Sequence, residues 1–393
     1  MTMIDESSVV AFSLAIQEKD KEAYYIGNRK LNEYIEVPKE AVDVIRLFDG
    51  KRNVQQVIQR YNELYDEPVD ILEFVQDLHE LQMVYSIDGN VVGFLDEVEH
   101  RPIVKKIAGF LFNKVSVCIY LGLFLASLTL MLTHRHEILN TEYSVLFPRF
   151  FGISFLCYTL ASWGIILFHE LGHYFAAVSI DIPVRFTLNL RYLFLVVEAD
   201  INGVWAVPKA KRYIVYLAGM CSDSVILFIA LLGKFYFAVG NPLLLSVCNM
   251  VALVICLSFI QQLMLFARTD LYYVLLTALN VNGLYMYLRH FIRSHILRKE
   301  EKTDDYPTTY VAIFFIISIF GVVFACISTY YNFKIIFEYL YGGMQEILTK
   351  QPWMIIDGLC AVAVSVLNVV LWISGFKNYI RQYRTERLEQ EEA

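Results

Sequence analysis

Residues 150–173 read FFGISFLCYTLASWGIILFHELGH, and this stretch decides the fold of the chain. Phe150 to Phe168 is an almost unbroken run of aliphatic and aromatic residues, long enough for a helix that crosses a lipid bilayer. Two histidines and a glutamate follow the run directly. Ionisable residues at the edge of lipid are costly unless something pairs with them, so this cluster is a candidate functional site.

The spacing of these polar residues predicts a metal site. His169 and His173 are four residues apart, so on a helix they project from one face and can bind one ion. Glu170 lies beside them, in position to accept a proton from an attacking water. A His-Glu-x-x-His pattern also arises by chance on solvated surface helices, but the apolar flank argues against that reading here. We therefore predict that zinc (Zn2+) binds His169 and His173, with Glu170 as the catalytic base.

Composition predicts the class of fold. The chain has 393 residues, is 57% hydrophobic and contains 28 Phe and 26 Tyr, which is too apolar for a soluble protein of this size. We predict a polytopic α-helical membrane protein with about six transmembrane helices. The expected spans are Val115–Leu132, Phe150–Ile180, Tyr213–Val239, Leu243–Phe266, Tyr310–Tyr330 and Trp353–Gly375.

The distribution of Lys and Arg predicts the orientation. Basic residues gather before the first span, between the second and third, between the fourth and fifth, and after the sixth, whereas the opposite loops hold few. By the positive-inside rule, both termini are expected to be cytosolic, in a multi-pass protein of a bacterial plasma membrane. The first 100 residues lack the apolar core of a cleavable signal peptide.

Residues 1–100 form a different kind of sequence. Helical patterns cover residues 38–48, Asn53 to Leu64 and Val69 to Gln82, and a β-hairpin is expected over Met83–Phe94 around Asp88-Gly89-Asn90. Three helices and a hairpin predict a small α+β winged-helix domain. Nucleic acid is not expected as a partner, because the few basic residues of this region are outnumbered by Glu63, Asp66, Glu67, Asp70, Glu73, Asp77 and Glu80.

The string VPKEAVDVIRLFDGKRNVQQVIQRYNELYDEPVDILEFVQDLHELQMV, residues 37–84, resembles the PqqD-like domain. The resemblance covers about residues 25–92. It implies that the domain holds the leader of a ribosomally made precursor peptide as an added β-strand. The partners implied are that precursor peptide, a peptide-modifying enzyme and an export transporter, beside the lipid membrane itself.

Two histidines leave a catalytic zinc short of a third protein ligand. Acidic residues within or near the expected spans are the candidates, and depth in the membrane separates them. Asp270 lies at the inner side, as His169 does, whereas Asp357 lies at the outer end of its span. Asp223 is close enough to approach the metal and is expected to play a supporting part. Further acidic candidates in the intervening loop are Glu198 and Asp200.

Three motifs in order, FHELGHYFAA (168–177), YIVYLAGMCSD (213–223) and ARTDLYYVLLTALNVNGL (267–284), are similar to the site-2 protease class of intramembrane zinc metallopeptidases. The resemblance is to its peptide zinc metalloprotease branch and covers about residues 105–290. It implies that Asp270 is the third zinc ligand. Leu271 replaces the family's usual glycine, and Met220, Cys221 and Asp223 replace its usual Ala-Gly-Pro…Asn pattern.

The segment VRFTLNLRYLFLVVEADINGVWAV, residues 184–207, predicts a membrane-associated β-hairpin with Asn202-Gly203 as its turn. Its edge is one candidate for holding an unwound substrate, because a helical peptide bond must be extended before water can attack it. The alternative is a hairpin that only lies on the lipid surface, anchored by Tyr192 and Trp205.

Together these patterns predict an intramembrane zinc endopeptidase that cleaves a peptide or membrane-associated precursor in the maturation of a ribosomally synthesised, modified peptide. The expected domains are a peptide-recognition domain over residues 1–100, a transmembrane protease domain over 101–376 and a charged cytosolic tail over 377–393. Two alternatives stay open: a non-catalytic membrane partner in peptide binding or export, and a general quality-control protease for membrane proteins.

Overall fold

The computed structural model describes residues 4–19, 22–65, 69–139, 150–191, 194–280, 284–297 and 308–392. Two compact units divide the chain. The first unit comprises Met1–Phe112, Tyr174–Arg185 and Asp200–Val215. The second comprises Asn113–His173, Phe186–Ala199 and Tyr216–Ala393.

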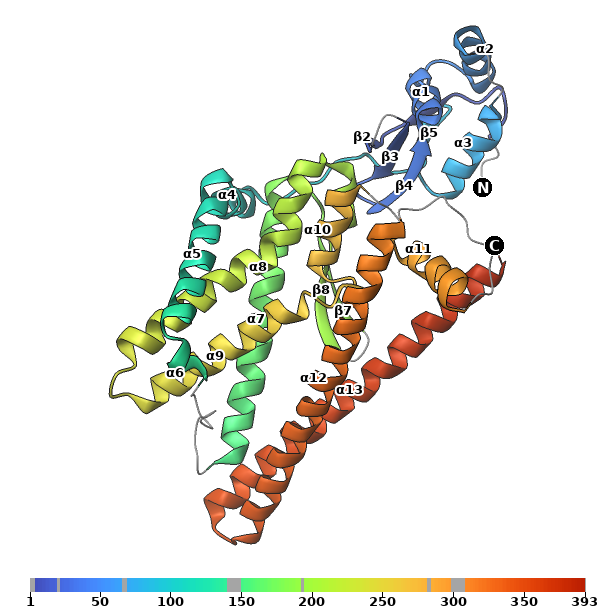
Figure 1. The fold of residues 1–393 in the computed structure, drawn as a ribbon. Coiled ribbons are helices and arrows are strands. Elements are labelled where there is room, and N and C mark those ends of the chain that lie inside the picture. Colours follow the sequence, from blue (N-terminus) through green and yellow to red (C-terminus); the bar gives the residue numbers. More distant parts are fainter. Residues whose placement is uncertain are drawn as a thin grey trace. The chain divides into compact units, whose positions relative to one another are not determined.

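Three short helices of the first unit confirm the predicted ones: α1 (Lys39–Leu47), α2 (Val54–Leu64) and α3 (Ile71–Glu80) (Figure 1). A capping box begins α2, because the Asn53 side chain accepts a hydrogen bond from the Gln56 amide and the Gln56 side chain accepts one from the Asn53 amide. One apolar face of each helix packs into a common core. Its fully buried members include Val42, Val44, Val54, Val57, Tyr61, Ile71, Val75 and Leu78.

The predicted hairpin is also confirmed. Strands β5 (Val84–Ile87) and β6 (Asn90–Val91) pair antiparallel. The turn residues Asp88 and Gly89 both have positive φ, 50° and 78°, which is what a two-residue hairpin turn of this hand requires. A further strand, β1 (Val10–Phe12), pairs with the other edge of β5.

The sequence patterns missed a second sheet in this unit. Strands β2 (Ala15–Glu18), β3 (Ala23–Asn28) and β4 (Glu33–Pro38) form an antiparallel meander in the order β2-β3-β4. Tyr25 and Ile26 are adjacent in the central strand and both are buried. Because successive strand residues point to opposite faces, both faces of β3 are covered, and the period-two alternation that marks a half-buried strand is lost.

A segment distant in the sequence packs against this sheet. The 3-10 helix η1 (Asn202–Ala206) packs against β2, β3 and β4. The ring of Trp205 lies 5.0 Å from that of Tyr25. The buried guanidinium of Arg212 lies 5.0 Å from the Trp205 ring and 5.3 Å from the Tyr25 ring, and its Nε donates to the Val207 carbonyl. Residues 200–215 therefore form one packed unit with the N-terminal sheet.

The hairpin prediction for residues 184–207 was right about the hairpin and wrong about its turn. Strands β7 (Arg185–Arg191) and β8 (Phe194–Asp200) pair with each other and both end before Asn202. The proposed anchor Tyr192 lies outside the described residues. Asn202 and Gly203 begin η1 instead. An Asn-Gly pair favours any tight turn, and here it serves the bend that follows β8.

The second unit is mostly helical, and its spans confirm the predicted membrane class. Among the described residues, six helices are long and apolar enough to cross a membrane, so the chain is a multi-pass membrane protein. The candidate spans are Lys114–Thr133 in α5, Phe151–Ser179 (α7), Lys209–Phe237 in α8 and η2, Pro242–Gln261 (α9), Thr309–Leu348 in α12 and Pro352–Asn378 in α13. The ends of α7 and α8 also contribute residues to the first unit.

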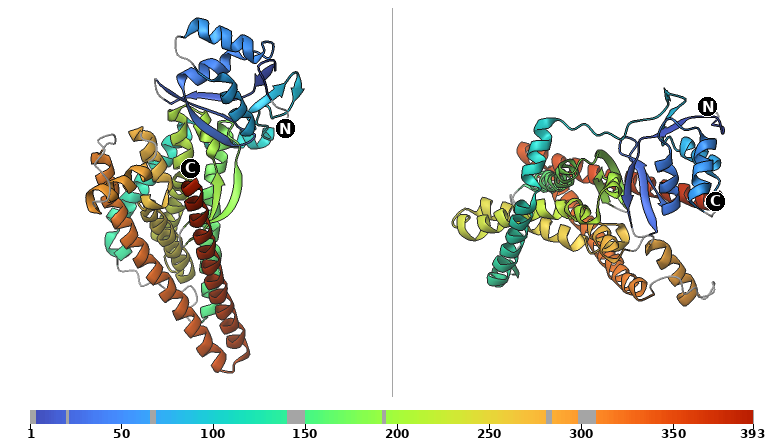
Figure 2. Two further views of the ribbon diagram at one scale, coloured as in Figure 1. Left: turned by 90° about the vertical axis from the view of Figure 1, so that its right-hand side faces the viewer. Right: turned by 90° about the horizontal axis from the view of Figure 1, so that it is seen from above.

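Shorter elements complete the architecture. They are α4 (Pro102–Leu111), α6 (Arg135–Leu139), η3 (Leu265–Ala267), α10 (Asp270–Leu279), α11 (Leu284–Phe291) and η4 (Ile292–Ile296). Helices α12 (Thr308–Leu348) and α13 (Pro352–Glu392) lie side by side along much of their length (Figures 1 and 2). Small residues allow this approach: a Cβ on Gly343 would meet Gly358 and Ala361, and one on Gly358 would meet the Gly343 carbonyl.

Candidate metal centre

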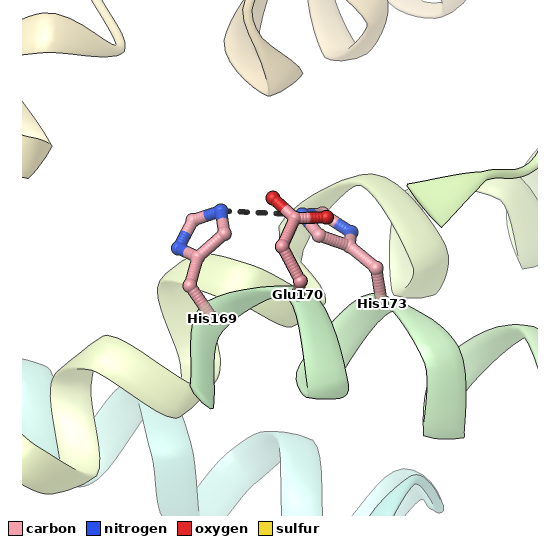
Figure 3. Close-up of side chains that lie close together, drawn as sticks. All are labelled: His169, Glu170 and His173. Atoms are coloured by element: carbon pink, nitrogen blue, oxygen red, sulfur yellow. Dashed lines mark hydrogen bonds between the residues drawn. The ribbon is translucent and has the colours of Figure 1, made fainter. Parts of the chain in front are cut away.

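Helix α7 (Phe151–Ser179) positions the His-Glu-His group. Both imidazoles and the Glu170 carboxylate project to the same side of the helix (Figure 3). The Nε2 atoms of His169 and His173 are 3.3 Å apart, and both side chains are buried. One nitrogen or oxygen from each of the three residues lies within 4.8 Å of the others. The group is therefore compact enough to hold a metal ion.

Asp270 joins the two histidines from a different helix. Its Oδ2 lies 3.1 Å from His169 Nε2 and 3.3 Å from His173 Nε2. The three atoms thus form a nearly equilateral triangle. In a tetrahedral zinc site with bonds of about 2.0–2.1 Å, neighbouring ligand atoms are separated by about 3.3 Å. The observed spacing fits that donor geometry, with two imidazole nitrogens and one carboxylate oxygen.

Gln262, which the sequence patterns did not single out, holds Asp270 in place. The Gln262 Nε2 donates to Asp270 Oδ2 over 3.0 Å, and the Asp270 amide donates to Gln262 Oε1 over 3.1 Å. The Thr269 hydroxyl in turn donates to the Gln262 carbonyl. Asp270 is the first residue of α10, so these bonds join the end of α9 to the start of α10. The only sequence signal for this role is a polar residue at the end of an apolar span.

Close packing of α8 against α7 surrounds the His169 ring. A Cβ on Gly219 of α8 would collide with three ring atoms of His169, and one on Gly172 of α7 would lie 2.7 Å from the Ala218 carbonyl. Both glycines therefore permit an approach that any larger residue would prevent. In the sequence, the only sign of this close helix contact was the pair of small residues Ala218-Gly219 inside an apolar span.

Asp223, the predicted supporting residue, contacts the far side of the same ring. Its Oδ2 lies 2.8 Å from His169 Nδ1, and the Ser258 hydroxyl donates to the same oxygen over 3.4 Å. Asp223 is 1% exposed and lies on α8, one helical turn beyond Gly219. Its carboxylate is thus placed behind the histidine and away from the three converging atoms.

Asp357 lies at the other end of α7, as the depth argument predicts. Its two oxygens accept hydrogen bonds from the Gly152 and Ile153 amides, while Glu346 accepts one from the Phe151 amide. These carboxylates satisfy the free N–H groups at the start of α7. Ile153 is 16 residues before His169, or about 24 Å along the helix.

The remaining candidates belong to β8 and η1. Glu198 and Asp200 belong to β8, whose side chains lie outside the described residues. Asn202 and Gly203 belong to the first compact unit, whereas His169, Glu170, His173, Asp223 and Asp270 all belong to the second. A Cβ on Gly203 would lie 2.8 Å from Ile182 and 3.4 Å from the Tyr34 hydroxyl, so this glycine has a packing role.

Comparison with known proteins finds no matching family model, no matching curated protein and no matching solved structure. The fold and the site therefore define the class: a multi-pass membrane protein with a buried His-Glu-His group that can bind a metal ion.

Proposed function

We propose that this protein is an intramembrane zinc endopeptidase, with zinc held by His169, His173 and Asp270. The main support is the triangle formed by the two Nε2 atoms and Asp270 Oδ2, with sides of 3.1, 3.3 and 3.3 Å. These residues lie on α7 and α10 of the second unit. Two imidazoles and one carboxylate are a common protein ligand set for catalytic zinc. Such a set leaves a fourth position for a substrate or water.

Glu170 is the catalytic base in this proposal. A zinc ion held by His169, His173 and Asp270 would supply Lewis acidity to the scissile carbonyl and to water. The Glu170 carboxylate, next to His169 on the same side of α7, takes the proton of the attacking water. It then delivers that proton to the leaving amine. Asp223 does not compete for this task, because it is buried behind His169.

The proposed substrate class rests on how a peptide bond becomes accessible to attack. A peptide bond inside a helix is shielded, so a substrate must be extended before it can be cut. Hairpin β7–β8 is a two-stranded element to which an extended segment can add as a further strand. We propose that the substrate is a peptide or membrane-associated precursor held there in extended form.

Recruitment of a precursor peptide is assigned to the edge of strand β2. The Lys19 amide donates to the Ala23 carbonyl, and the register pairs Gln17 with Tyr25. Because antiparallel bonding alternates, the backbone groups of Gln17 point toward β3 and those of Ile16 and Glu18 point away from it. Among the described strands, β2 pairs with β3 alone, so this edge is available for strand addition.

The same proposal places both termini in the cytosol and the protein in a bacterial plasma membrane, on the asymmetry of Lys and Arg between the loops. A peptide-modifying enzyme and an export transporter are the expected neighbours of such a maturation protease.

A non-catalytic peptide-binding or export partner is the second candidate. It shares the membrane fold and the metal group, but it has no use for a carboxylate beside the metal ligands. The presence of Glu170 on the same side of α7 as both histidines favours the protease. A general quality-control protease shares the site and differs only in lacking leader recruitment.

Metal analysis of the purified full-length protein tests the proposal. We expect about one zinc per chain, and a sharp loss in the His169→Ala/His173→Ala double variant. Asp270→Ala should lose zinc as well, whereas Asp357→Ala should keep it, because Asp357 lies at the far end of α7. Unchanged zinc content in the double variant contradicts the site.

A further inference from the structure

The contact between Asp223 and His169 has features that a loose polar contact lacks. The distance from Oδ2 to Nδ1 is 2.8 Å, the carboxylate is 1% exposed, and Asp223 stands on a membrane-spanning segment. A charged side chain in such a place is costly unless a partner stabilises it. Among the described residues, its second oxygen, Oδ1, has no hydrogen-bond partner. His169 is therefore the principal partner of this carboxylate.

We propose that Asp223 is the positioning residue of the metal site, which fixes the tautomer and orientation of His169; this inference rests on the proposed zinc site. A neutral imidazole carries one N–H and one lone pair. A carboxylate at Nδ1 requires the N–H there, which leaves the lone pair on Nε2. That nitrogen faces His173 Nε2 and Asp270 Oδ2.

Sterics and hydrogen bonding act on the same ring from one helix. Gly219 of α8 brings backbone against the His169 ring, and Asp223, four residues later, holds Nδ1. The backbone at Gly219 thus restricts the position of the His169 ring, and the hydrogen bond from Nδ1 to Asp223 restricts its orientation. Carboxylates that orient metal-binding histidines in this way typically contribute 10–100-fold in metal affinity or activity.

Charge balance supplies a second argument. A divalent cation bound by two neutral imidazoles and the Asp270 carboxylate leaves one positive charge uncompensated. The Asp223 carboxylate, in contact with His169, balances it without occupying a ligand position. In a low-dielectric membrane interior an uncompensated charge is costly, so the sign and position of Asp223 favour metal binding.

The test measures zinc affinity of the full-length protein in nanodiscs, by competition with a chromophoric chelator, for Asp223→Asn and Asp223→Ala. Asn keeps an acceptor oxygen for Nδ1 but loses the charge, whereas Ala loses both. We expect zinc affinity to fall about 10-fold or less in Asp223→Asn and about 10–100-fold in Asp223→Ala. The visible spectrum of the Co2+-loaded protein should change in the Ala variant, as the orientation of one ligand is lost.

Asp357→Asn is the matched control, because it removes another buried carboxylate charge near α7 but acts on backbone amides at its far end. It should retain wild-type zinc affinity. Equal affinity of wild type and both Asp223 variants overturns the positioning role alone, as does an equal loss in Asp357→Asn. Absence of zinc binding by the wild type overturns the zinc site and this inference together.

Discussion

Glu170 is the single charged residue of α7, and the geometry of its neighbours decides what it can do. His169 and His173 flank it in sequence and turn their Nε2 atoms toward each other and toward Asp270. The Asp223 carboxylate is hydrogen-bonded to Nδ1 of His169, on the other side of that ring. Each carboxylate of the cluster thus has a different position relative to the imidazoles, and the three are not interchangeable.

Substituting Glu170 separates metal binding from catalysis. Glu170→Gln keeps the size of the side chain but cannot accept a proton, so we expect cleavage to fall by at least about 100-fold while zinc content stays at the wild-type level. The measurements are peptide cleavage in liposomes, with a membrane-anchored peptide library, and metal analysis of the same sample. Cleavage near the wild-type rate would assign the base to another residue.

At the scale of elements, α8 crosses α7 closely beside the proposed metal site. Gly172 lies against Ala218, and Gly219 lies against the His169 ring, so two backbones meet where side chains would otherwise intervene. A second pair of contacts, from Gln262 at the end of α9, secures Asp270 at the start of α10. The site is therefore a product of helix packing rather than of one helix.

Gly219→Ala tests this packing. The added methyl group would overlap the His169 ring, so we expect about 1–3 kcal/mol of destabilisation and at least about a 10-fold loss of zinc affinity. Gly164→Ala in α7 is the matched control, because a Cβ there meets nothing within 4 Å. Thermal unfolding and chelator competition on both variants make the comparison. Equal behaviour of the two variants contradicts the packing argument.

At the scale of the whole molecule, the N-terminal sheet is more than a detachable module. Tyr25 contacts Trp205, in the connection between β8 and the third span, and Arg212, in the first turn of that span. Removal of the first 95 residues would therefore expose an aromatic ring and a buried guanidinium. A point substitution at the sheet edge is a cleaner test of recruitment than a deletion.

Glu18→Pro is that substitution. The backbone amide of Glu18 points away from β3. Proline at this position therefore removes an outward-pointing donor and leaves the hydrogen bonds between β2 and β3 intact. If a leader peptide adds to β2, the KM for a leader-bearing precursor should rise about 10-fold with kcat little changed, since a few backbone bonds supply most of the affinity. Glu18→Ala should behave as wild type. A wild-type KM in the proline variant would mean that recruitment uses another surface.

Local periodicity determined much of this protein from the sequence alone. The six spans depend on long apolar runs, and the helices from Lys39 to Glu80 depend on apolar spacing, caps and turns within a few residues. The pair His169 and His173 is likewise local, because four residues on a helix fix a common face. For Asp270, depth along the spans argued against Asp357 but not against Asp223, and the motif resemblance implied the choice between them.

Only the tertiary structure decided the contacts between distant segments. Asp223 is 54 residues from His169 and Asp270 is 101 residues from it, so their approach depends on how α8, α9 and α10 pack, which no periodicity encodes. Gln262 and Gly219 acquire their roles in the same way. The sheet β2-β3-β4 could not be predicted because both faces of its central strand are covered, which removes the alternation of apolar and polar residues. The turn at Asn202-Gly203 was assigned to the wrong place because a turn-forming pair does not indicate which strands it connects.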